Sequence, residues 1–259
     1  MKVGIFDSGM GGLSVLHRAL EIMPEIDFIY YADRVHVPYG EKSQEQIQGF
    51  VDEIIAFMLQ KKVDAIVIAC NTATSVATKE YRSKFPVPII GMEPAVKRAV
   101  EEYHDVPGRI LVAATPVTIA GEKLQNLVER VDEADQVDLI ALPGLVRFAE
   151  KGEFESDQVV DYLKKCLEGY FVENYKAVVM GCTHFNYFKE NYMHIFPEHT
   201  AYVDGIDGTL RQLLRKLPER EDKKTAGSVE YYYSGQAVTE EERKEIEQYL
   251  RQLDKVEHI

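Results

Sequence analysis

The segment Val63-Asp-Ala-Ile-Val-Ile-Ala-Cys-Asn-Thr-Ala-Thr74 decides the fold of this chain. Its apolar run, Ala65 to Ala69, stops at Cys70, and small polar residues follow. A short apolar run closed in this way predicts a buried strand that delivers a loop at its carboxyl end. Ligands of open α/β sheets bind at that edge, so we expect Cys70 to lie in a functional site.

A second segment has the same construction. In Lys176-Ala-Val-Val-Met-Gly-Cys-Thr-His184 an apolar run again ends in a small residue, a cysteine and polar residues. The repetition indicates one structural unit used twice, and each copy presents a thiol, Cys70 or Cys182.

Hydrophobic periodicity predicts alternating strands and helices along most of the chain, and therefore mostly parallel sheets. Besides the run before Cys182, the expected strands cover 2–6, 28–31, 65–69, 87–90, 109–114, 137–142, 201–203 and 228–234. The expected helices cover 13–22, 43–60, 75–85, 94–102, 119–130, 145–150, 157–171, 185–195, 206–217 and 239–253. The charged segment 219–224 is expected to be a solvated loop.

The alternating pattern restarts near Pro94, so the chain is predicted to hold two similar α/β domains with mostly parallel sheets. We expect a pseudo-twofold relation between them, with the carboxyl ends of the strands facing each other across a cleft. Cys70 and Cys182 would then stand on opposite walls of an active site in that cleft.

Composition limits the kinds of partner. The 259 residues are 46% hydrophobic and 28% charged, as in ordinary globular proteins. The net charge of −13 argues against binding to nucleic acid or to an anionic membrane surface. The sequence contains no apolar run long enough to span a bilayer, and Asp7 interrupts the N-terminal apolar run, unlike a signal peptide. We therefore expect a cytoplasmic protein.

Two facing thiols suit the inversion of a carbon that carries an acidic hydrogen. One thiolate removes the proton, and a thiol on the other face returns one. A free cysteine has a pKa of about 8.5, and a helix N-terminus after each thiol would favour the thiolate. Asp7 and His184, one near each thiol, are candidates for holding or moving protons. Carboxylates and an ammonium group could be held by the polar groups of Ser8, Asn71, Thr72 and Thr183.

Other interpretations of these residues stay open. A cysteine at a strand end is often only a small buried hydrophobe, and polar residues after it can simply cap a helix. A zinc site or a redox pair would use the same cysteines, although the usual short spacings are missing. Gly9 and Gly11 form an incomplete dinucleotide fingerprint. Cys166 lies in a helical pattern and is expected to pack.

Four segments resemble, in order and spacing, the motifs of the glutamate racemase family. They are Phe6-Asp7-Ser8-Gly9-Met10-Gly11-Gly12, Val37-Pro38-Tyr39-Gly40-Glu41-Lys42-Ser43, Ala69-Cys70-Asn71-Thr72-Ala73-Thr74 and Gly181-Cys182-Thr183-His184. Tyr232-Tyr233-Ser234-Gly235 also resembles the C-terminal strand of that family. These isomerases interconvert L- and D-glutamate without a cofactor and supply D-glutamate for peptidoglycan, and hence for cell wall and cell shape.

The resemblance implies a discontinuous first domain, residues 1–94 plus 205–259, and a second domain, residues 95–204. It implies that Cys70, assisted by Asp7, deprotonates D-glutamate, and that Cys182, assisted by His184, deprotonates L-glutamate. It also implies an acidic residue near the site, Glu150, a homodimer, and no cofactor or metal. The implied substrate contacts are Asp7, Ser8, Tyr39, Gly40, Asn71, Thr72, Thr183 and His184.

Three segments depart from the pattern of the family. Phe185-Asn186 replaces Tyr-Pro after His184, Thr115-Pro116-Val117-Thr118 replaces Thr-x-Gly-Thr, and Asp33-Arg34-Val35-His36 is also atypical. They leave one alternative to a glutamate racemase, a racemase of aspartate or another small amino acid. A hypothesis from another class is a non-catalytic protein that binds a small molecule in the same cleft.

Overall fold

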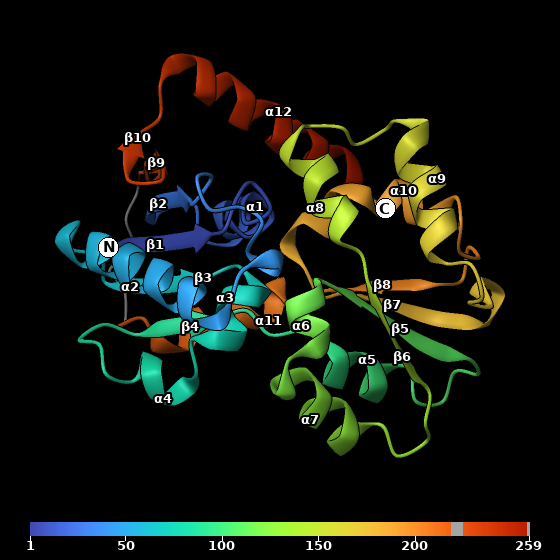
Figure 1. Cartoon of the computed structure of the whole chain (residues 1–259). Helices are drawn as coiled ribbons and strands as arrows, with labels where there is room; N and C mark the ends of the chain where they lie inside the picture. The colour runs from blue at the N-terminus through green and yellow to red at the C-terminus, as the bar shows by residue number, and fades with distance from the viewer. Residues whose placement is uncertain (219–224, 258–259) are drawn as a thin grey trace.

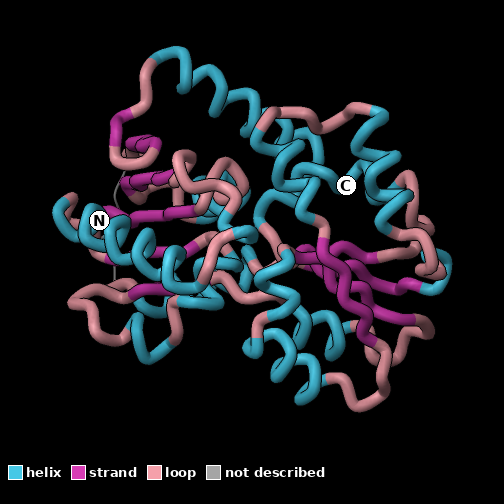
Figure 2. Tube along the Cα trace, viewed as in Figure 1, coloured by secondary structure: helices cyan, strands magenta, loops and turns pink. Residues whose placement is uncertain are grey.

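The computed structural model describes residues 1–218 and 225–257 of the chain, in which the strands form two separate sheets (Figure 2). The first sheet has the order β10-β9-β2-β1-β3-β4, and all its neighbours are parallel except β10 and β9. Its strands are β1 (Lys2–Asp7), β2 (Asp27–Ala32), β3 (Ala65–Ile68), β4 (Ile89–Gly91), β9 (Val229–Tyr233) and β10 (Gln236–Ala237).

The second sheet is wholly parallel, with the order β6-β5-β7-β8. Its strands are β5 (Arg109–Ala114), β6 (Val137–Ala141), β7 (Tyr175–Met180) and β8 (Ala201–Val203). The predicted fold class, two α/β halves with mostly parallel sheets, is confirmed. The segment near the C-terminus that was expected to be a strand is β9, which pairs with β2 of the first sheet.

Helices cover the faces of both sheets (Figure 1). The chain passes from the first half to the second after β4 and returns after β8. The helices of the first half that precede β4 are α1 (Leu13–Ile22), the short 3₁₀ helix η1 (Tyr39–Glu41), α2 (Gln44–Gln60), α3 (Asn71–Val76) and α4 (Lys79–Arg82). Those of the second half are α5 (Val96–Glu102), α6 (Pro116–Ala120), α7 (Glu122–Val131), α8 (Pro143–Glu150), α9 (Asp157–Cys166), η2 (Val172–Asn174), η3 (Thr183–Phe188) and α10 (Lys189–Met193). α11 (Ile206–Lys216) and α12 (Glu240–Glu257) follow β8, after the chain has returned to the first half.

The C-terminal helix α12 connects the two halves. It starts beside β10 and runs over to the second half (Figure 1), where Tyr249 donates a hydrogen bond to the Ala149 carbonyl at 2.8 Å. Gln252 donates to the Tyr187 carbonyl at 3.1 Å. Through these bonds α12 holds α8 and η3, two elements that carry residues of the candidate site described below.

Some predicted helix boundaries are wrong. The helix expected over 75–85 is two helices, because α3 already starts at Asn71 and Thr78 caps a new helix through its bond from the Tyr81 N–H. The helix expected over 157–171 ends at Cys166, before Gly169, whose φ of +92° favours glycine. The helix expected over 185–195 is η3 followed by α10.

A capping box closes the start of α2. The Ser43 hydroxyl accepts the Gln46 N–H at 3.2 Å, and the Gln46 side chain accepts the Ser43 N–H at 3.0 Å. The expected solvated loop at 219–224 lies outside the described residues. Among the described helices, none is long and apolar enough to cross a membrane.

Candidate active site

The two thiols reach one cavity because each follows a strand at its carboxyl end. Cys70 comes two residues after β3, and Cys182 comes two residues after β7. The halves bring these strand ends together near the middle of the molecule (Figure 1), and both thiols line the same cavity. The same cavity is lined by six of the predicted binding residues: Ser8, Tyr39, Gly40, Asn71, Thr72 and His184.

Cys70 is held in its neutral form. Its Sγ caps α3 by accepting the Ala73 N–H at 3.4 Å, and its thiol donates to Ser8 Oγ at 3.6 Å. Burial raises the pKa of Cys70 to about 12, and the negative charge of Asp7 adds to this effect. The Ala73 N–H at the start of α3 lowers the pKa of Cys70, as expected of a helix N-terminus, but burial outweighs this effect, so Cys70 is not the expected thiolate.

The second thiol belongs to a chain of polar groups. His184 Nδ1 lies 3.7 Å from Cys182 Sγ, and His184 Nε2 lies 2.7 Å from Glu150 Oε1. Burial alone would lower the pKa of His184, but its hydrogen bonds with Cys182 and Glu150 outweigh burial and raise this pKa well above its ordinary value. His184 is therefore an imidazolium at neutral pH, and it donates to both neighbours.

The Gly11 N–H also lies 3.2 Å from His184 Nε2. One ring nitrogen cannot accept this N–H while it donates its own hydrogen to Glu150. The contact with Glu150 is shorter and assisted by charge, so we take Nε2 as the donor to Glu150. Glu150 Oε1 also accepts the Met10 N–H at 2.6 Å, which ties α8 of the second half to the glycine-rich loop of the first.

Asp7 and Thr183 lie behind the cavity wall. The fully buried Asp7 carboxylate accepts the Gly9 N–H at 3.1 Å and the Thr183 hydroxyl, also at 3.1 Å. Burial raises the pKa of Asp7, while the charge of His184 opposes this rise. These two predicted residues therefore link the strand ends of the two halves and reach the cavity through their neighbours.

Two threonines of the second half were not assigned to the site from the sequence. Thr115 Oγ1 lies 2.9 Å from Thr72 Oγ1 across the cleft, and the Thr115 hydroxyl donates to Thr118 Oγ1 at 3.0 Å. The three hydroxyls form one cluster of donors and acceptors. The sequence did contain a signal for Thr115, because this residue directly follows strand β5 as Ser8 directly follows β1.

The walls of the thiol cavity stand close together. The cavity measures about 10 Å³, which is about the space that one water molecule needs. An amino acid needs more, so the halves have to separate for a substrate to enter. A far larger groove of about 1320 Å³ lies elsewhere, between α4, α5 and α11, and contains neither thiol.

The described residues contain no group of three His, Cys, Asp or Glu side chains arranged to hold a metal ion. Among the described residues, the polar side chains that line the thiol cavity supply two sulfur atoms, hydroxyls, an amide, the His184 imidazolium and the Glu41 carboxylate. These groups can move protons and bind a small charged molecule.

The comparisons with known proteins identify the family. Residues 13–213 match the family model described as Asp/Glu/hydantoin racemase. The glutamate racemase of Lachnospira eligens is 47% identical over 265 residues, which span all of both chains.

Solved structures agree. The glutamate racemase of Francisella tularensis in complex with D-glutamate has a TM-score of 0.79 and 27% identity, over 96% of this chain and 93% of that one. The Escherichia coli glutamate racemase in complex with L-glutamate and the activator UDP-MurNAc-ala has a TM-score of 0.76 and 27% identity, over 92% and 99%. The chain therefore belongs to the Asp/Glu racemase family, among its glutamate racemases.

Proposed function

We propose that this protein interconverts L-glutamate and D-glutamate by moving protons at the α-carbon, without a cofactor. The observation that carries the proposal is the pair of thiols that reach one cavity from two halves of the chain. Curated relatives at 47% identity over the full chain are glutamate racemases, which supports glutamate as the substrate. The product D-glutamate would supply peptidoglycan synthesis.

The neutral Cys70 thiol suits the direction from L- to D-glutamate. Cys182, whose Sγ contacts the His184 ring, is the proposed base that removes the α-proton, and the electron pair stays on the α-carbon. Cys70, whose raised pKa keeps it a thiol, gives its proton to the opposite face. Cys70 is then a thiolate and Cys182 a thiol, and exchange with solvent resets the pair.

The reverse direction starts from a Cys70 thiolate. Asp7 is the carboxylate nearby, and burial raises its pKa, so it can take up the proton more readily than an exposed aspartate. We therefore propose Cys70 with Asp7 as the base for D-glutamate, and Cys182 with His184 as the base for L-glutamate.

Substrate binding is proposed for the polar groups on both walls. Among the described residues, the buried Asn71 Oδ1 has no hydrogen-bond partner, and an ammonium group would supply one. The hydroxyls of Ser8, Thr72 and Thr115 are suited to carboxylates. The hydroxyl of Tyr39 instead donates to Asp33, so we propose that Tyr39 and Gly40 contact the substrate through ring and backbone.

A circular-dichroism assay with purified protein, L-glutamate and no added cofactor tests this function. Loss of the optical signal, with D-glutamate as product, is the expected result. No change with either enantiomer of glutamate, followed by turnover of aspartate, would favour the related racemase. No turnover of any amino acid, with binding retained when both thiols become serine, would favour a non-catalytic binding protein.

Several broader properties are also proposals. We propose domains of residues 1–94 plus 205–259 and of residues 95–204, because β9 pairs with β2, and α11 packs against β3 and β4. We propose a homodimer on the basis of the family. The three cysteines are free, which fits the reducing cytoplasm, and we propose that location.

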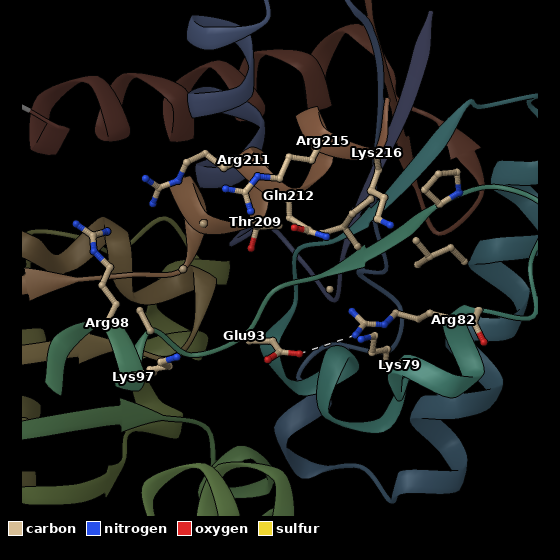
Figure 3. Close-up of a pocket in the computed structure, with 18 of the residues that line it drawn as sticks. Lys79, Arg82, Glu93, Lys97, Arg98, Thr209, Arg211, Gln212, Arg215 and Lys216 are labelled. Carbon is tan, nitrogen blue, oxygen red and sulfur yellow. Dashed lines mark ion pairs between the residues drawn. The ribbon is translucent and has the colours of Figure 1, made fainter. Parts of the chain in front are cut away.

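The large groove is a proposed site for an anionic effector (Figure 3). Among the described residues, seven Lys or Arg and four Asp or Glu side chains line it, although the chain as a whole is acidic. The side chain of Arg82 is 11% exposed, and its Nε has no partner among the described residues. The E. coli relative contains the activator UDP-MurNAc-ala.

The groove lies where the chain crosses between the halves, since a Cβ on Gly205 would stand 2.5 Å from the Glu93 carbonyl oxygen. A ligand there is placed to influence how the halves separate. We expect UDP-MurNAc-ala to change the racemisation rate of the wild type and to lose this effect in Arg82→Ala. An unchanged wild-type rate at saturating nucleotide would contradict the proposal.

A further inference from the structure

Asp33 is a buried carboxylate to which the proposed reaction gives no role. It follows β2 at the sheet edge that carries Asp7, and its N–H donates to the Asp7 carbonyl at 3.0 Å. Its side chain is only 3% exposed. A buried carboxylate has to be matched by hydrogen-bond donors, so its donors show which parts of the molecule it holds together.

In the part of the chain that the structure describes, three side chains donate to this carboxylate or lie within hydrogen-bond distance of it. The Tyr39 hydroxyl donates at 2.6 Å, and His36 Nδ1 lies 2.9 Å and 3.0 Å from the two oxygens. The Ser234 hydroxyl, in the turn between β9 and β10, donates at 3.1 Å. Because His36 and Tyr39 both belong to the loop 36–41, Asp33 fastens this loop to the edge of the first sheet.

The loop 36–41 forms the side of the thiol cavity that touches the second half. Tyr39 and Gly40 line the cavity, and η1 packs against α6. The fit is close, since a Cβ on Gly40 would stand 2.9 Å from Thr115 Cβ. The His36 ring stacks on Phe50 with 3.8 Å between the ring centres, which fixes the other end of the loop on α2.

We propose that Asp33 is a positioning residue, which holds the loop 36–41 in the place where it closes over glutamate. The Tyr39 hydroxyl acts through Asp33 and makes no contact with the substrate. The inference rests on the proposed racemase function and adds a specific role for a carboxylate outside the two proton-transfer pairs.

A proton relay from Cys70 through Tyr39 to Asp33 is the competing explanation. Burial and the charge of Asp33 raise the pKa of Tyr39, which makes this hydroxyl a poor carrier of a proton. The two explanations also differ in kinetics. A loop that is out of place weakens the binding of both enantiomers, whereas a lost relay slows the direction in which Cys70 is the base.

The test compares Asp33→Asn, Tyr39→Phe and the double variant with the wild type, using L-glutamate and D-glutamate separately. We expect KM to rise about tenfold for both enantiomers in Asp33→Asn, with the same pH dependence of kcat as the wild type. The double variant should have the KM of Asp33→Asn alone, because the Tyr39 hydroxyl, the group that Tyr39→Phe removes, acts only through this carboxylate. Asp52→Asn, which removes the charge of another carboxylate that accepts a tyrosine hydroxyl, that of Tyr81, is the matched control and should keep KM.

Three results would overturn the inference: an unchanged KM in Asp33→Asn, a fall of kcat in one direction only, or KM effects of the two single changes that multiply in the double variant. If Asp33→Asn does not fold, Tyr39→Phe is the test variant. An unchanged KM of Tyr39→Phe for both enantiomers would then overturn the inference.

A second readout does not depend on turnover. Hydrogen exchange of peptides covering residues 36–41 should be faster in Asp33→Asn than in the wild type, and equal rates would also refute the inference. Failure of the wild type to racemise glutamate would instead refute the proposed function, so the two failures are distinguishable.

Discussion

Replacement of Glu150 by glutamine removes the charge that faces His184 and keeps the shape of the side chain. Glu150 is 13% exposed, and its Oε1 accepts hydrogen bonds from His184 at 2.7 Å and from the Met10 N–H at 2.6 Å. The loss of one partner of a buried ion pair costs about 3–5 kcal/mol. Because glutamine still accepts the Met10 N–H, we expect the lower end of this range, about 3 kcal/mol of unfolding free energy near pH 6.

The pH dependence has a definite sign. The pKa of His184 is raised in the folded protein, and an unfolded histidine has a pKa of about 6.5. The raised pKa means that protonated His184 stabilises the folded protein. This stabilisation is complete below about pH 6.5 and is lost as pH rises through the pKa that His184 has in the folded protein. The difference between wild type and Glu150→Gln should therefore be larger near pH 6 than near pH 9.

Urea unfolding of both proteins at the two pH values measures this difference, and NMR of the His184 ring follows its protonation. Glu155→Gln is the control, since the exposed Glu155 pairs with Lys255 at the surface. This substitution should change the unfolding free energy by less than about 1 kcal/mol. Equal free energies for wild type and Glu150→Gln at pH 6, or a His184 ring that loses its proton near pH 6.5 in the wild type, would refute the reasoning.

Three further predictions concern the site and its support. In Gly11→Ala the new Cβ would stand 2.5 Å from His184 Nδ1, so we expect at least a tenfold loss of kcat/KM with the fold retained, and wild-type activity would contradict this. The raised pKa of Cys70 predicts that its alkylation, followed by mass spectrometry, keeps accelerating above about pH 10, whereas a plateau near pH 8.5 would contradict it. Tyr249→Phe loses the bond to the Ala149 carbonyl and should lower the unfolding free energy by about 1 kcal/mol in urea, with no change as the opposing result.

The sequence was sufficient to predict the two α/β halves and the placing of the thiols. Both depend on local patterns, because an apolar run that stops at a small residue indicates a buried strand and its carboxyl end. The two runs before Cys70 and Cys182 are β3 and β7, and both thiols line one cavity as expected.

Properties that depend on tertiary surroundings were less predictable. The short helix after Cys70 suggested a thiolate, but burial among residues distant in sequence raises its pKa. Likewise, the sequence pattern of loop 36–41 does not show that Tyr39 donates to Asp33. Nothing in the sequence of α12 shows which carbonyl groups of the second half its side chains reach. The contact between Glu150 and His184 could not be predicted, since the two residues belong to different elements and lie far apart in the chain.

The most direct test of the central claim is the racemisation of L-glutamate in heavy water, with the α-position of both enantiomers examined at early turnover. The two-base mechanism predicts solvent deuterium in the D-glutamate that forms, while the remaining L-glutamate keeps its hydrogen, because Cys182 takes the proton on one face and Cys70 returns another on the opposite face. Deuterium that appears in both enantiomers from the start, or activity that survives in Cys70→Ser and Cys182→Ser alike, would contradict it.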